Sequence, residues 1–142
     1  MEKPGAESFD MQKMLADYME NGLLENIIDM FKHDESLYAY VGYLLRDERM
    51  RVRIGVTALL ETLIKEEPEK ANNALSPLLS LLKDQSPVIR GDAAYLLGIL
   101  GNKGAIPSLR EIANDEDATV KLIVNEAIDD IHGILGPVNA VQ

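Results

Sequence analysis

The sequence predicts an all-α fold built from about four pairs of antiparallel helices that stack one after another. Apolar residues recur at helical spacing, and no segment alternates apolar and polar residues as a half-buried strand would. One motif occurs three times, at residues 47–53, 84–90 and 115–121, and places an aspartate six residues before a basic residue. Units that recur at intervals of 37 and 31 residues are typical of repeat proteins, in which each unit buries its apolar face against its neighbours.

Length and composition limit the classes of function. The chain has 142 residues, which is enough for one domain, and its net charge of −10 disfavours broad binding to nucleic acid or an anionic membrane. It has no cysteine, which excludes disulfides and thiolate metal sites. The first ten residues lack the apolar stretch of a signal peptide, and no apolar run is long enough to span a membrane. We therefore expect a cytoplasmic protein with no cofactor and no bound metal.

The N-terminal third is less regular than the rest. Residues 1–7 are expected to be disordered, and residues 9–20 and 23–33 are expected to form helices separated by Asn21 and Gly22. The two helices lack the motif, so we interpret residues 8–36 as a degenerate pair that caps the stack. Together with the regular part they are expected to form one domain over residues 8–135, followed by a flexible tail at 136–142.

Three regular units are expected at residues 37–66, 69–101 and 104–134. In each unit the helix that follows the motif carries an apolar stripe at helical spacing, which predicts a face buried in the core. Ser86 and Pro87 suit the N-cap and the first position of the second such helix. The six extra residues of the first interval fall near residues 66–71, which predicts a longer loop. The stripes are Val52, Val56, Leu59, Leu60 and Leu63; Ile89, Ala93, Leu96, Leu97 and Leu100; and Val120, Val124, Ala127, Ile128 and Ile131.

The motif and the stripe that follows it resemble the HEAT repeat, in particular the phycobilisome-lyase-type HEAT-like repeat. The likeness is clear over residues 37–134, strongest at 84–104, and weak over 8–36. The resemblance implies an α-solenoid, a right-handed superhelix with the first helices on its convex side and the second helices on its concave side. It also implies a ladder of charge-assisted bonds along the stack. The residues of this ladder would be Asp47, Arg53, Asp84, Arg90, Asp115 and Lys121.

We expect a non-enzymatic module that binds another protein in a concave groove. No serine has a histidine and an acid at a plausible spacing, so no catalytic residue is assigned. The second helices carry apolar residues opposite the core stripe, which favours a site for a basic or amphipathic partner segment, although these residues could also pack between repeats. The expected partner-binding residues are Ile54, Ala58, Thr62, Tyr95, Ile99, Leu122 and Glu126.

Other surfaces leave alternatives open. Arg46, Arg49 and Arg51 cluster at one turn and could bind nucleic acid, but no basic stripe continues along the second helices. The resemblance also allows an accessory subunit or a lyase-type chaperone for a chromoprotein or another enzyme. The residues Tyr38, Tyr40 and Tyr43 could form a second docking surface or pack against the N-terminal helices. The last helix carries Glu126, Asp129, Asp130 and His132, a weak set of metal ligands. The oligomeric state stays open.

Overall fold

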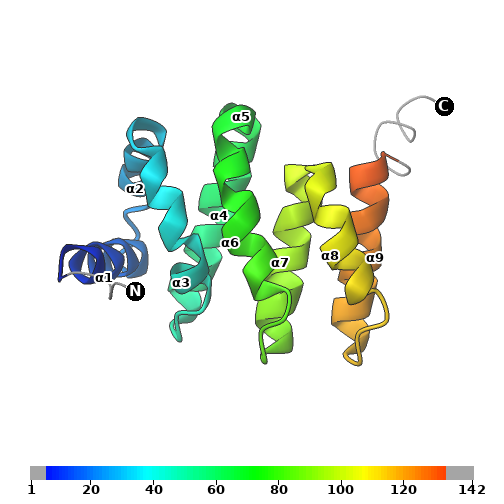
Figure 1. Ribbon diagram of the computed structural model, residues 1–142. Coiled ribbons are helices and arrows are strands. Elements are labelled where there is room, and N and C mark those ends of the chain that lie inside the picture. The colour runs from blue at the N-terminus through cyan, green and yellow to red at the C-terminus, as the bar shows by residue number, and fades with distance from the viewer. Residues whose placement is uncertain (1–5, 134–142) are drawn as a thin grey trace.

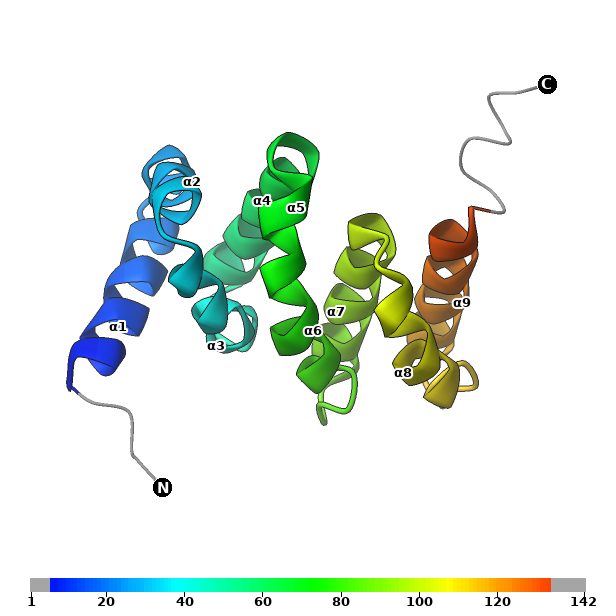
Figure 2. The same cartoon turned by 45° about the horizontal axis from the view of Figure 1, so that its top comes forward.

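The structure, a computed structural model, describes residues 6–133, and this range contains helices and turns but no strand. The helices form two layers that run along the molecule (Figures 1 and 2), and the chain is an α-solenoid. One layer holds the long second helices, α4 (Met50–Glu66), α7 (Pro87–Leu100) and α9 (Ala118–His132). The other layer holds the short first helices, α3 (Val41–Leu45), α6 (Leu75–Leu81) and α8 (Ile106–Glu111).

Each first helix follows a 3₁₀ turn, which recurs in all three repeats. These turns are η1 (Glu35–Tyr40), η2 (Asn72–Ala74) and η3 (Lys103–Ala105). The lengthened loop predicted near residues 66–71 forms an additional short helix, α5 (Pro68–Ala71), which begins at a proline because the first helical position needs no N–H donor. The extra residues therefore extend one end of a helix pair without interrupting the stack.

The predicted stripes form the core. All five stripe residues of α4 are fully buried, and the stripe residues of α7 and α9 are either buried or packed against the same cluster. Those packed at its edge are Ile89, Leu100 and Ile128. The helix signals are confirmed as well: the Ser86 hydroxyl accepts a hydrogen bond from the Ile89 amide, and α7 ends at Gly101 with a φ of 73°, a left-handed conformation that glycine adopts readily.

The N-terminal helices, α1 (Ala6–Glu20) and α2 (Leu24–His33), are separated by Asn21 and Gly22 as predicted. In Figure 1, α1 runs at a steep angle to α4, against which it packs. Its buried side chain Met19 lies directly over Gly55 of α4, so that a Cβ atom added at Gly55 would collide with it. Of the segments expected to be disordered or flexible, residues 6 and 7 belong to α1, and residues 1–5 and 136–142 lie outside the described range.

The second helices do not all approach one another equally closely. Helix α9 packs much more intimately on α7 than α7 does on α4. The close contact depends on Gly98, where an added Cβ atom would lie 3.0 Å from the Cβ atom and 3.1 Å from the Cα atom of Ala127. Since one of these atoms belongs to the backbone of α9, a side chain at residue 98 would push the helices apart.

We therefore expect Gly98→Ala to lower the free energy of unfolding, even though alanine is favoured over glycine within helices by about 0.5–1 kcal/mol. Gly42→Ala is the matched control, because Gly42 is also helical and an added Cβ atom there would meet only the Pro77 carbonyl oxygen at 4.0 Å. That variant should gain stability. Urea unfolding of both variants checks the prediction, and a Gly98→Ala protein as stable as Gly42→Ala would contradict it.

Candidate functional site

The exposed large apolar side chains gather on the second helices. Of the seven that are exposed among the described residues, five lie on α4, α7 and α9, and only Leu23 and Tyr43 lie elsewhere. The exposed fractions of these five range from 42% for Tyr95 to 65% for Met50. We call this surface the second-helix face and define it by Met50, Ile54, Val88, Tyr95 and Leu122.

Sequence reasoning identified part of this face. It expected Ile54, Tyr95 and Leu122, which are exposed, and it missed Met50 and Val88, although these lie four residues before Ile54 and seven before Tyr95 on the same helical faces. The other expected residues are placed differently. The Glu126 side chain is exposed but polar, and the remaining three, Ala58, Thr62 and Ile99, are half-buried.

Two of these half-buried residues contribute mainly to the helices themselves. Ile99 packs against the core, because it follows Gly98 where α7 and α9 converge, and so it does not extend the exposed face. The Thr62 hydroxyl donates to the Ala58 carbonyl oxygen of its own helix at 3.0 Å. Apart from Tyr95, the exposed apolar side chains therefore lie toward the N-terminal ends of the second helices.

A groove separates α4 from α7 on this face. It has a volume of about 420 Å³, and Tyr95 of α7 reaches across to α4, where its hydroxyl donates to a Glu61 carboxylate oxygen. Four apolar and four polar side chains line this α4–α7 groove: Met50, Ile54, Ala58 and Val88, with Arg53, Thr57, Glu61 and Asp92. A second hollow of about 300 Å³ lies between α7 and α9 and shares Val88 and Asp92 with the groove.

The repeat register explains why the groove opens at this joint. The 37-residue interval aligns Ile54 with Gly91 and Glu61 with Gly98. The two glycines of α7 let α9 approach, with Gly98 against Ala127 and Gly91 near Ile123, whereas α4 carries larger side chains at both positions. The same register places Asp92 where α9 has Ile123, so a carboxylate stands at a position used for apolar packing in the next joint.

Asp92 is half-buried, and this burial raises the pKa of its carboxyl group, while the nearby positive charge of Arg53 acts in the opposite direction. No hydrogen bond to its side chain occurs within residues 6–133. The Asp92 carboxylate therefore depends on water in the groove for its hydrogen bonds.

The expected ladder is formed at one step and altered at the other. Arg90 donates from Nε and Nη2 to the two carboxylate oxygens of Asp115, both at 3.0 Å, and thereby joins the second repeat to the third. Asp84 instead pairs with Arg46 of the preceding turn, at 3.0 Å from Nε to Oδ1. Arg53, expected to serve this step, donates to the backbone carbonyls of Asp47 and Glu48.

The looser contact between α4 and α7 explains why Arg53 does not pair with Asp84, because Arg53 belongs to α4 and α4 stands away from the next repeat. At the end of the ladder, Lys121 is exposed, and no ion pair of its side chain is found within the described part of the chain.

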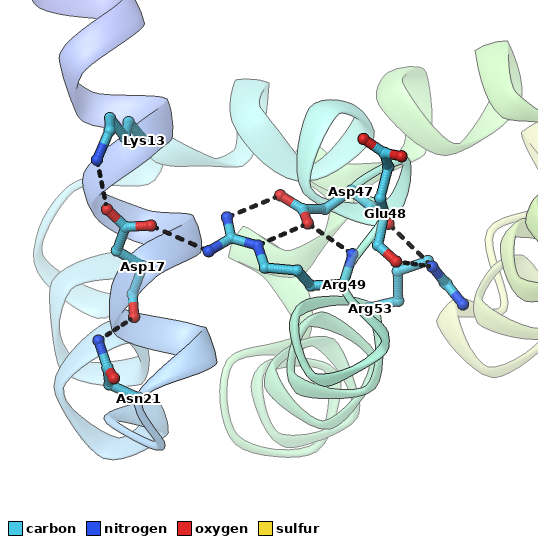
Figure 3. A network of polar contacts seen from close by, with 7 residues as sticks. All are labelled: Lys13, Asp17, Asn21, Asp47, Glu48, Arg49 and Arg53. Carbon is cyan, nitrogen blue, oxygen red and sulfur yellow. Dashed lines mark hydrogen bonds and ion pairs between the residues drawn. The ribbon is translucent and has the colours of Figure 1, made fainter.

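The arginine cluster is largely neutralised by carboxylates. Arg49 lies between Asp47 and Asp17 and binds both, with Nε 3.0 Å from Asp47 and Nη1 3.1 Å from Asp17, so that it ties α1 to the turn before α4 (Figure 3). The guanidinium of Arg49 lowers the pKa of Asp47. Because Arg46 is engaged with Asp84, only Arg51 of the three candidate residues has no ion pair among residues 6–133. The cluster therefore presents little free positive charge.

The tyrosines do not form a common surface. The Tyr38 ring is buried edge-on against Phe31 of α2, with ring centres 5.1 Å apart, which agrees with packing against the N-terminal helices. Tyr40 is half-buried, and only Tyr43 is exposed, at 55%. On the last helix, the acidic side chains and His132 do not form a group of three or more potential ligands able to hold a metal ion, and no such group occurs elsewhere in the described range.

Comparison with known proteins gives one result. The family described as HEAT repeats matches residues 41–129, which include the second-helix face and the Arg90–Asp115 pair. No curated protein and no solved structure matches the chain. Within residues 6–133, none of the helices combines the length and apolar character needed to cross a bilayer.

The contribution of the Arg90–Asp115 ion pair to stability can be tested by substitution. Arg90→Met and Arg53→Met each remove a pair of hydrogen bonds to the backbone carbonyls of the preceding turn, but only Arg90→Met also breaks a part-buried ion pair between repeats. We expect Arg90→Met to lower the free energy of unfolding by about 1–2 kcal/mol more than Arg53→Met.

The difference in the free energy of unfolding between Arg90→Met and Arg53→Met should also depend on pH. The hydrogen bonds from Arg90 lower the pKa of Asp115 from its ordinary value of 3.8. A lowered pKa in the folded state stabilises the fold above the ordinary value, and this contribution disappears as the pH falls through the lowered value. Urea unfolding at neutral pH and below 3.8 should therefore show the gap between the variants closing in acid, whereas equal losses at neutral pH would contradict the role of Asp115.

Proposed function

Since this chain belongs to the HEAT repeat family, we propose that it is a non-enzymatic module that binds a segment of another protein on its second-helix face. HEAT repeats generally mediate protein–protein interaction. The single observation that carries the proposal is the concentration of five exposed apolar side chains on α4, α7 and α9. Contiguous exposed apolar surface is a feature of partner sites, because it has to be removed from water.

The groove indicates how a partner would be bound. A hollow between two parallel neighbours in one layer accepts the ridge of side chains on a third helix. The backbone groups within α4 and α7 are already hydrogen-bonded inside their helices, so an extended segment would gain no backbone partners there. An amphipathic helix satisfies its own backbone and can place apolar side chains against Ile54, Val88 and Leu122.

The alternative functions have less support. Binding of nucleic acid would require free cations, yet Arg46 and Arg49 are both paired with aspartates. A role as accessory subunit or chaperone for a chromoprotein would require a pocket that encloses a flat apolar group, and the two hollows of the second-helix face are open grooves. Both grooves suit a protein segment better.

Photo-crosslinking tests the location of the site. A photoreactive amino acid at Val88, on the second-helix face, should capture a protein from a native lysate, whereas the same group at Ser80, exposed on the opposite layer, should not. Equal capture from both positions, or capture from Ser80 alone, would contradict the proposal.

Substitution tests the apolar anchors. We expect Ile54→Asp combined with Leu122→Asp to reduce the captured protein at least tenfold, since each aspartate would have to be desolvated in the complex. Tyr43→Asp is the matched control, because Tyr43 is similarly exposed but lies outside the second-helix face. All three side chains are exposed, so folding should change by only about 0.5 kcal/mol per residue, which circular dichroism during unfolding can verify. If Tyr43→Asp alone abolished capture of the protein, the binding site would lie on α3 and the proposal would be contradicted.

A further inference from the structure

The polar lining of the α4–α7 groove has one side chain without a hydrogen bond. Arg53 donates to two backbone carbonyls, Thr57 donates to the Arg53 carbonyl, and Glu61 accepts from Tyr95. Asp92, the remaining polar group, accepts no hydrogen bond within the described residues. In the free protein the groove leaves this carboxylate open to water. A ligand that covers the groove removes that water, so it has to supply a donor to Asp92 in exchange.

The charge of the groove selects the kind of donor. Two carboxylates, Asp92 and Glu61, face one guanidinium, that of Arg53, and the chain as a whole has a net charge of −10. The Arg53 group is held toward the carbonyls of the turn before α4. A cationic donor is therefore favoured over a neutral or anionic one, since it forms the stronger charge-assisted bond and is attracted by the surrounding field.

The apolar lining determines what accompanies the cation. Met50, Ile54 and Val88 border the same groove and are each more than half exposed, at 65%, 62% and 57%. A partner that covers them has to present apolar side chains within one helical turn of its cation, which on a helix means three or four residues away. The C-terminal segment of this chain, residues 134–142, contains no lysine or arginine and so cannot supply the cation.

We infer that the α4–α7 groove recognises an amphipathic helix whose apolar face carries a lysine or arginine, with the cation bound to Asp92 and its apolar neighbours packed on Met50, Ile54 and Val88. This inference rests on the proposed function and specifies the chemistry of the partner. The raised pKa of Asp92 is consistent with it, because a bound cation would reverse the effect of burial and stabilise the carboxylate.

A library of helical peptides displayed on phage, with randomised positions on one face, tests the inference without knowledge of the partner. Selection on the full chain should enrich lysine or arginine flanked by apolar residues three or four positions away. Selection on Asp92→Asn should lose this preference, and selection on Asp92→Lys should replace it with aspartate or glutamate. The control Glu69→Gln removes an exposed carboxylate of α5 outside the groove and should leave the preference unchanged.

A selected peptide then allows a quantitative test. Replacing its cationic residue with methionine should weaken binding to the full chain about tenfold, the effect of one well-placed ion pair, and should leave binding to Asp92→Asn nearly unchanged. An equal loss on both proteins would overturn the pairing with Asp92.

The remaining outcomes separate the two proposals. Peptides that lack a preferred cation but no longer bind when Ile54 and Leu122 are changed to aspartate would overturn the role of Asp92 and retain the second-helix face as the binding site. A library that yields no binding peptide would overturn the helical occupant. Concentration-dependent dimerisation of the chain that Asp92→Asn weakens would identify a second copy as the occupant and would likewise overturn the inference.

Discussion

A helix pair in this protein cannot bury its apolar stripe by itself, and the rest of the structure follows from that constraint. The stripes of α4, α7 and α9 are covered only because the next pair lies against them, so stability is distributed over a row of interfaces between neighbours. The first of these interfaces would be open without α1, which places Met19 over Gly55 and is tied down by Arg49. At the other end, most of the exposed side chains of α9 are polar, with Leu122 as the large apolar exception.

The interfaces are unequal, and the inequality creates the candidate site. Gly91 and Gly98 allow α9 to pack tightly on α7, whereas Ile54 and Glu61 stand at the aligned positions of α4 and keep α7 at a distance. The side chains that prevent close packing are the ones that line the resulting groove. Because α4 and α7 pack less closely, the groove between them is able to accept side chains of another molecule.

The sequence predicted the fold well because its information is local. A stripe with helical period specifies which side of a helix is buried, and hence also which side carries Ile54 and Leu122. The site was predicted only in part, because its remaining features depend on distances between helices. Whether Arg53 or Arg46 reaches Asp84 is decided by the width of the α4–α7 joint, and the same width leaves Asp92 without a donor. That width depends on which side chains meet between neighbouring helices, and a helical stripe alone does not show which of them meet.

The uneven joints also bear on elasticity. In a one-dimensional array, bending and partial opening concentrate at the weakest interface, since each unit is held only by its neighbours. Among the second helices the loosest contact is that between α4 and α7, near the middle of the molecule (Figure 2), while α3 and α6 join the same two repeats in the other layer. A helix bound between α4 and α7 would restrain the movement of the two repeats relative to each other. We therefore expect amide exchange to slow in both repeats at once when the helix binds.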